Sequence, residues 1–139
     1  GVVSIDDTTQ STSVITGSLH TDGGLGVAKD IYIGGFLNIG ARDELTISSG
    51  VITATRTNHS IDTQADASTD DLDTINGGSE GDIIIISPAS SARTIVVKDG
   101  TGNLFIAGDF SMDNDTDQII LINRFGSQWF EVSRSNNGA

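Results

Sequence analysis

Two Gly-Gly pairs divide the region from Gly17 to Gly40 into short apolar alternations, and this pattern constrains the fold more than any other feature of the chain. The pairs are Gly23-Gly24 and Gly34-Gly35, and the aliphatic residues around them fall mostly at odd spacing, which is the periodicity of β-strands. No fragment between the glycines is long enough to bury a core by itself. A ribbon of this kind gains order by winding against copies of itself, so the pattern favours a fibrous or oligomeric β-structure over a monomeric enzyme.

The composition supports an all-β fold with an aliphatic core. Hydrophobic residues make up 36% of the chain and aromatic residues only 5%, and the β-branched residues Ile, Val and Thr favour strands over helices. Gly accounts for 17 residues, and nearly all the acids are Asp, which is a poor helix residue and a good turn residue. We therefore expect short strands joined by many turns.

The charge and the absence of cysteine exclude several classes of partner and site. The formal net charge is -12, so phosphate backbones and anionic membrane surfaces would repel the chain. A chain without cysteine forms no disulfide and no thiolate metal site. The longest apolar run, Ile83–Ile86, has the length of a strand rather than of a membrane span. We expect no nucleic-acid partner and no membrane insertion.

We expect two parts in the chain: residues 1–55 as a Gly-punctuated β-stalk that mediates oligomerisation, and residues 56–139 as a compact C-terminal β head. The segment Leu45–Thr57 surrounds the turn Ser48-Ser49-Gly50 and predicts a hairpin of two short strands. The most polar portion follows it, and Ser68–Leu72 within that portion predicts a single helical turn.

From residue 82 onward, short apolar runs and turn residues alternate regularly. The runs predict six strands: Asp82–Ser87, Thr94–Lys98, Asn103–Ala107, Asp109–Met112, Asp117–Asn123 and Gln128–Arg134. Spacing of this kind is typical of a β-sandwich, a barrel or a β-solenoid. We expect a sandwich or barrel for the head, with a β-solenoid as the alternative.

The residues from Gln10 to Gly35, QSTSVITGSLHTDGGLGVAKDIYIGG, carry a resemblance to a known class of proteins. They combine a polar Thr/Ser lead, Gly-Ser-Leu, Gly-Gly-Leu-Gly-Val-Ala-Lys and an aromatic strand that ends in Gly-Gly. This order resembles a repeat of bacteriophage and cyanophage fibre and virion structural proteins. Lys98–Leu104 and Trp129–Ser135 also look like parts of a terminal module of such proteins.

The resemblance implies a structural role in the virion, the extracellular phage particle, and it implies homotrimers. The fold we expect is therefore an intertwined trimeric β-stalk followed by the head. Tail fibre, head fibre and capsid decoration all remain open, and capsid or tail proteins would be the partners. The apolar residues of the ribbon would lie near the shared axis, so we predict this trimer interface: Leu19, Leu25, Val27, Ile31, Ile33 and Ile39.

No catalytic residue is predicted, and we expect a protein that is not an enzyme. His59 has a Ser and an Asp close by in sequence, but catalytic triads assemble in space, so we interpret it as a surface or interface imidazole. Glu131 beside Trp129 is the carboxyl whose apolar setting best suits a general acid. We interpret it instead as an ion-pair partner of Arg134 or Arg124.

Metal and cofactor sites are not predicted either. Asp113–Asp117 places oxygen ligands at alternating positions, but an EF-hand loop needs Gly at its sixth position and Glu at its twelfth. Gln118 and Arg124 occupy these positions, so we interpret the run as a solvated turn. The Gly-rich spacings also lack the Gly-Lys-Ser/Thr of a phosphate loop.

The aromatic residues leave a second function open. Trp129, Glu131 and Tyr32 are possible ligand contacts, and the head would then be the glycan-binding receptor-recognition part of a tail fibre. Hydrolysis of a host polysaccharide by Glu131 is a third alternative. The other aromatic residues of note are predicted to be core residues: Phe36, Phe105 and Phe110.

Overall fold

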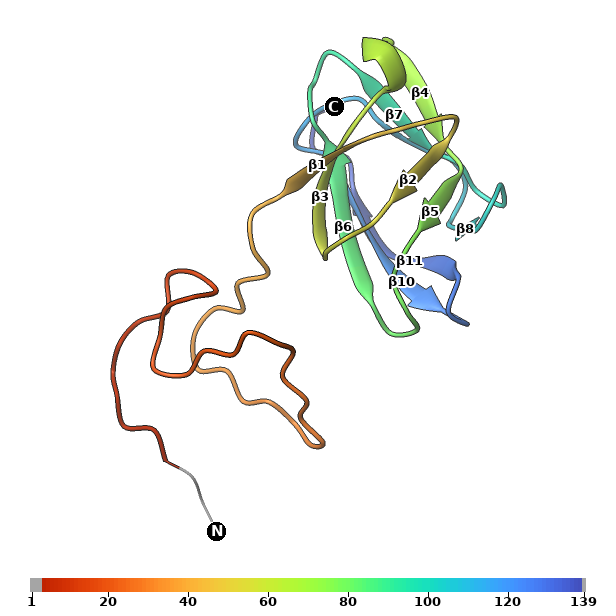
Figure 1. Cartoon of the computed structure of the whole chain (residues 1–139). Coiled ribbons are helices and arrows are strands. Elements are labelled where there is room, and N and C mark those ends of the chain that lie inside the picture. The colour runs from red at the N-terminus through yellow and green to blue at the C-terminus, as the bar shows by residue number, and fades with distance from the viewer. Residues whose placement is uncertain (1–3, 139) are drawn as a thin grey trace. The chain divides into compact units, whose positions relative to one another are not determined.

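The computed structural model describes residues 4–138, which belong to two compact units that divide between Leu37 and Asn38. Every strand within the described residues lies in the second unit (Figure 1), including two strands before residue 55 that the sequence analysis assigns to the stalk. The elements are β1 (Asp43–Thr46), β2 (Val51–Thr53), β3 (Asn58–Asp62), η1 (Gln64–Asp66), β4 (Thr69–Leu72), β5 (Thr74–Asn76), β6 (Ile83–Pro88), β7 (Thr94–Val97), β8 (Leu104–Phe105), β9 (Phe110–Met112), β10 (Gln118–Arg124) and β11 (Gln128–Ser135). With 37% strand and 2% helix, the all-β prediction is confirmed.

Parallel pairing between successive turns makes the second unit a β-solenoid of about three turns. Strands β1, β3 and β6 stack in one sheet, β2 and β5 in a second, and β4 and β7 in a third. The register passes through the stack, because Leu45 lies opposite Ile61, which lies opposite Pro88. The solenoid, our alternative to a sandwich or barrel, is therefore the architecture that the head adopts.

The chain reverses direction after the third turn. Strand β9 pairs antiparallel with β7, β10 with β6, and β11 with β10, while β8 joins β11 in parallel. A solenoid needs a closing element where its turns end. The reversing strands supply that element, and they enlarge the first sheet to the order β1-β3-β6-β10-β11-β8.

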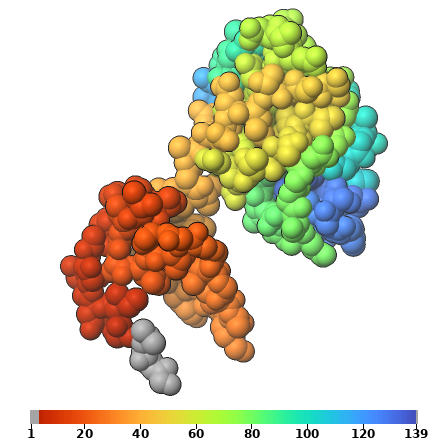
Figure 2. Space-filling model, in the orientation of Figure 1, coloured from red at the N-terminus to blue at the C-terminus, as the bar shows by residue number. Residues whose placement is uncertain are grey.

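Alternating residues of the strands fill the solenoid with aliphatic side chains. In β10, for example, Ile119 and Leu121 are buried, and Ile120 and Ile122 between them are only partly buried. Burying one such side chain fully contributes about 1.5–3 kcal/mol. The fully buried core consists mainly of Ile and Leu, closed by Trp129 and Met112. The second unit, which encloses this core, is the body drawn from yellow to blue in Figure 2.

The first unit contains no strand or helix among its described residues, 4–37. Its hydrogen bonds are local: Ser11 Oγ donates to the Thr16 carbonyl at 2.9 Å, and the Thr12 N–H donates to Thr16 Oγ1 at 2.8 Å. The strands predicted for the ribbon are thus not formed in the single chain. The apolar alternation is present, but a strand also needs a neighbour for its backbone groups.

The hairpin predicted for residues 45–57 is wrong. Strands β1 and β2 pair with later turns instead of with each other, and the one isolated antiparallel bridge of this region joins Ser48, beyond β1, to Val51. Ser49 (φ 52°) and Gly50 (φ 78°) adopt the left-handed conformations that a tight hairpin also uses. They form a corner of the solenoid, which is held because the N–H groups of Asp73 and Thr74 donate to the Gly50 carbonyl at 2.8 and 3.1 Å.

The helical turn predicted for residues 68–72 is also wrong. Strand β4 occupies Thr69–Leu72 and pairs in parallel with β7, so that Leu72 lies opposite Val97 and both side chains are fully buried. The short 3-10 turn comes earlier, at Gln64–Asp66. Burial of Leu72 in the solenoid core outweighs a capping preference, which contributes only about 1 kcal/mol.

Candidate functional site

The residues predicted for the trimer interface all lie on one uncovered stretch, residues 14–39, which we call the apolar segment. Their exposed fractions range from 38% for Ile39 to 69% for Leu25. Phe36, predicted as a core residue, is fully exposed there, so that prediction is wrong for the single chain. Further large apolar residues of the segment are still more exposed, from 71% to 95%: Val14, Ile15, Tyr32 and Leu37. In the single chain, none of these large side chains has a core to enter.

The apolar segment carries little charge, since Asp22, Lys29 and Asp30 are its only Asp, Glu, Lys or Arg residues. Between residues 23 and 39, only Lys29 and Asp30 carry a charge at neutral pH, and the two charges are opposite. The whole chain has a net charge of -12. Copies of this stretch can therefore approach one another without the repulsion that acts elsewhere between copies of the chain.

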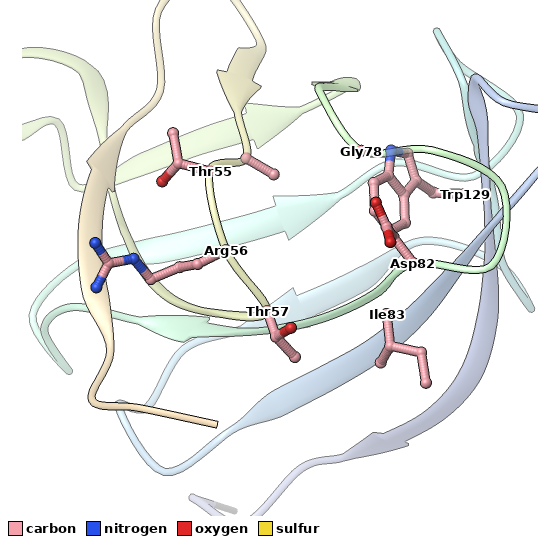
Figure 3. A pocket seen from close by; sticks show the side chains of 8 residues that line it. Thr55, Arg56, Thr57, Gly78, Asp82, Ile83 and Trp129 are labelled. Atoms are coloured by element: carbon pink, nitrogen blue, oxygen red, sulfur yellow. The ribbon is translucent and has the colours of Figure 1, made fainter. Parts of the chain in front are cut away.

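A pocket of about 240 Å³ lies in the solenoid beside Trp129 (Figure 3). Residues 54–57, which join β2 to β3, line one side, and residues of the loop before β6 line the other. Gly78 (φ 76°) lies so close to the indole that a Cβ added there would stand 2.9 Å from Cζ2 of Trp129. The close approach of loop and ring therefore requires glycine at this position.

The lining of the pocket is about equally polar and apolar. Thr55 and Thr57 contribute hydroxyl groups, and Asp82 contributes a carboxylate whose Oδ2 accepts the N–H of Ser79 at 2.7 Å. Ile83 supplies an apolar wall (Figure 3). Hydroxyl and carboxylate oxygens beside an indole are groups that could bind a polyhydroxylated ligand.

Trp129 lines the pocket but is only 1% exposed. Its Nε1–H donates to the Ile75 carbonyl at 3.0 Å and fixes the ring. A buried ring offers an edge to a ligand rather than a face on which a sugar ring could stack. Of the three predicted ligand contacts, only Trp129 lines this pocket; Tyr32 lies almost fully exposed in the first unit.

Glu131 forms the ion pair that the sequence analysis proposes. Arg134 Nε donates to Oε1 at 2.6 Å, Arg134 Nη2 contacts Oε2, and the Ala107 N–H donates to Oε2 at 2.8 Å. The hydrogen bonds from Arg134, followed by that from Ala107, outweigh partial burial and hold the pKa of Glu131 below its usual range. A general acid needs the opposite shift, so this geometry does not support the glycosidase alternative.

His59 is fully buried inside the single chain, so its interpretation as a surface or interface imidazole is wrong. Its Nδ1–H donates to the Asp43 carbonyl at 2.9 Å, and its Nε2 accepts the N–H groups of Thr55 and Arg56 at 3.2 and 3.3 Å. The ring ties β1 to the loop that enters β3. Both nitrogens are therefore engaged with the backbone in a structural role.

Asp117 is also fully buried, so this end of the run 113–117 is not a solvated turn. Oδ2 accepts the N–H groups of residues 113 and 114 at 3.1 Å each, and Oδ1 accepts those of Asn137 and Gly138 at 2.6 and 3.2 Å. The carboxylate thus ties the last described residues to the turn before β10. Within residues 4–138, no group of three His, Asp or Glu residues has the arrangement of a metal site.

The pocket residues Thr55, Thr57 and Asp82 were missed by the sequence reasoning. The Gly77-Gly78 pair before Glu80-Gly81-Asp82 does indicate a tight loop. Its position beside Trp129 depends on pairings between distant parts of the chain, which no local pattern reveals.

Comparison of the chain with protein-family models, with curated proteins and with solved structures gives no match. None of the helical residues described belongs to a helix with the length and apolar character needed to cross a bilayer.

Proposed function

We propose that this chain is a structural component of a phage virion, a non-enzymatic homotrimer that forms a fibre or a capsid- or tail-attached adhesion protein. The observation that carries the proposal is the apolar segment, whose large side chains remain uncovered in the single chain. Monomeric proteins rarely expose so many contiguous apolar residues without a partner. Its resemblance to phage fibre repeats supports the choice of partner, which is further copies of the same segment.

The energetics favour assembly of the segment. Burying one aliphatic side chain contributes about 1.5–3 kcal/mol, and each copy brings the six predicted interface residues to a shared axis. The opposed charges of Lys29 and Asp30 leave no net repulsion between residues 23 and 39. Backbone groups that lack a neighbour in one chain gain one when three chains intertwine. Threefold repetition then multiplies weak contacts with capsid or tail proteins into avidity.

Two aspartate substitutions in the segment test the proposal. We expect the native chain to be a trimer at micromolar concentration in light scattering, and Ile31→Asp with Ile33→Asp to give monomers, because each trimer would bury six carboxylates. Ser18→Asp, an exposed change at an even position of the same unit and therefore on the opposite strand face, is the control and should leave the trimer intact. A native monomer, or a trimer that survives both isoleucine changes, would contradict the assembly.

A glycan-binding head is the second candidate, and the pocket beside Trp129 is the observation that favours it. Its hydroxyl and carboxylate lining suits saccharide hydroxyl groups. Asp82→Asn should abolish binding on a glycan array, whereas Tyr32→Ala, outside the pocket, should not. Binding that is unaffected by Asp82→Asn, or no saccharide binding by the native chain, would refute this candidate.

A further inference from the structure

An unbroken row of apolar side chains crosses four strands on the outer side of the large sheet. Ile83 of β6 lies opposite Ile122 of β10, Ile122 lies opposite Phe130 of β11, and Phe130 lies opposite Phe105 of β8. These residues alternate with buried neighbours such as Ile84, Leu121 and Trp129. They therefore point away from the core, and we call them the outer row.

The aromatic end of the outer row is ordered by specific contacts. The rings of Phe105 and Phe130 stack with centroids 4.9 Å apart and planes 12° apart. Phe125 meets Phe130 edge-on at 6.2 Å, and the Arg124 guanidinium lies 5.8 Å from the centroid of Phe130. Phe105 is 40% exposed and Phe125 73% exposed, so the prediction that Phe105 is a core residue is wrong. This is a preformed aromatic surface in contact with solvent.

The outer row continues into a wider face that carries no acid. Ile85 lies opposite Ile120, and Ile120 lies opposite Ser133, which is exposed. The outward strand positions of this face carry Arg124 as their only charged residue: Ile83, Ile85, Phe105, Gln118, Ile120, Ile122, Arg124, Gln128, Phe130 and Ser133. The chain holds 19 acids against 7 basic residues. On the outward side of the same sheet, the acids Glu44 and Asp62 lie on β1 and β3, and Asp115 borders the face near Ile85 and Gln118. The outward positions of the four strands β6, β10, β11 and β8 are the part of this side that carries no carboxylate.

We propose that this acid-free face is the surface through which the solenoids of neighbouring copies meet. A second copy is the occupant that the charge distribution favours. Two chains of net charge -12 repel each other, and that repulsion decays over a Debye length of about 8–10 Å. Facing the acid-free surfaces toward one another keeps the acidic surfaces of the two copies farthest apart. When this face points toward a rotation axis of the oligomer, it contacts the equivalent faces of the other chains.

The apolar area of the face is smaller than the area that a standard protein interface buries. Ile83 (47% exposed) and Phe105 (40% exposed) are its most exposed apolar side chains and the others are half-buried, so the face presents on the order of 300 Å² of apolar surface. A standard interface buries about 800 Å² per partner. The face therefore supplements another contact, and the inference rests on the proposed function because the apolar segment would supply that contact.

The absence of cysteine from the chain makes the test direct. Ser133→Cys places a thiol on the acid-free face, and Ser111→Cys places one on the exposed side of β9, in another sheet. Both changes replace one oxygen by sulfur at an exposed strand position. The full-length chain with each single cysteine is treated with a mild oxidant and, separately, spin-labelled for electron-resonance distance measurements.

We expect interchain disulfides for Ser133→Cys and few for Ser111→Cys, together with a shorter interchain spin–spin distance at position 133. A trimer in light scattering whose position 111 cross-links as readily, or lies closer between chains, would overturn the inference and leave the proposed function standing. A native chain that stays monomeric at micromolar concentration would overturn both.

Discussion

Replacing Asn103 with Ala tests whether one side chain can substitute for a strand. Asn103 lies just before β8. Its Oδ1 accepts the N–H of Ile75 at 2.9 Å, and its Nδ2 donates to the Ile75 carbonyl at 2.9 Å and to the Ser127 carbonyl at 2.8 Å. The pair of bonds to Ile75 repeats what a neighbouring strand would make. Asn103 thus continues the two-stranded sheet of β2 and β5 by one step.

The size of the effect follows from what Ile75 loses. The Ala substitution removes three hydrogen bonds, each contributing about 0.5–1.5 kcal/mol net. Ile75 is buried, so its N–H is left without a partner, whereas its carbonyl keeps the bond from the Trp129 indole. We expect the free energy of unfolding to fall by about 3 kcal/mol. The melting temperature of a domain of about 100 residues should then decrease by about 10–20 °C.

Thermal unfolding, followed by far-ultraviolet circular dichroism and by the fluorescence of the single tryptophan, measures this loss. Asn76→Ala is the control, because Asn76 is adjacent to Ile75 in β5 but has an exposed side chain; it should change stability by less than about 0.5 kcal/mol. Equal losses from the Asn76 and Asn103 substitutions would refute the reasoning.

Asn103→Asp separates hydrogen bonding from packing. It keeps the shape and the acceptor but places a carboxylate against two carbonyl oxygens, which raises the pKa of that carboxyl in the folded state. Its stability deficit should therefore be largest at neutral pH and shrink as the pH falls through the raised pKa. A deficit that stays constant with pH would show that packing, rather than the hydrogen bonds, is lost.

Three further substitutions address the anchor, the ion pair and the turn before β8. Asp117→Ala should lower the free energy of unfolding by about 3 kcal/mol, read from urea denaturation, because four backbone N–H groups lose a fully buried acceptor. Glu131→Gln should cost about 1 kcal/mol at neutral pH. Arg134 lowers the pKa of Glu131, so the native ion pair contributes its full stabilisation at pH values above the ordinary pKa of 4.5. This stabilisation is lost as the pH falls through the lowered pKa. The melting temperatures of the native protein and the Glu131→Gln variant should therefore converge in acid. Gly102→Ala should lower the free energy of unfolding by about 3 kcal/mol, because the added Cβ would stand 2.1 Å from Thr74 Oγ1 and 2.2 Å from the Asp73 carbonyl oxygen. The control Gly100→Ala has a similar φ but open space around the Cβ, and it should cost about 1 kcal/mol in the same chemical denaturation.

The strands of the later solenoid follow from local sequence, whereas the corners do not. The run from Asp117 to Asn123 predicts β10 to within one residue at each end, because apolar residues and turn residues alternate clearly there. The turn at Ser49 and Gly50 is different, since left-handed residues serve hairpins and solenoid corners equally. Only the parallel pairing of Val51 with Thr74 of the next solenoid turn shows that Ser49 and Gly50 form a corner and not a hairpin turn.

The sites show the same division. The partnership of Glu131 with Arg134 is readable from their closeness in one strand. The role of Asn103 is not, because its partner Ile75 lies in a different turn of the solenoid. The four consecutive Ile residues from Ile83 did carry a signal of the outer row: a strand with a solvated face alternates, so an unbroken apolar run indicates two faces removed from water.

Strand β11 combines the closing of the solenoid with the proposed contact between copies, and alternation separates the two tasks. Trp129 points inward and bonds the Ile75 carbonyl, while Phe130 points outward and stacks on Phe105. Trp129→Phe should therefore lower stability by about 1–2 kcal/mol through the lost hydrogen bond without altering interchain distances. Phe130→Ser should lengthen the interchain distance at Ser133 while the solenoid stays folded, because the row loses its central ring. Loss of the fold from Phe130→Ser, or unchanged distances in that variant, would mean that the outer ring serves the single chain alone.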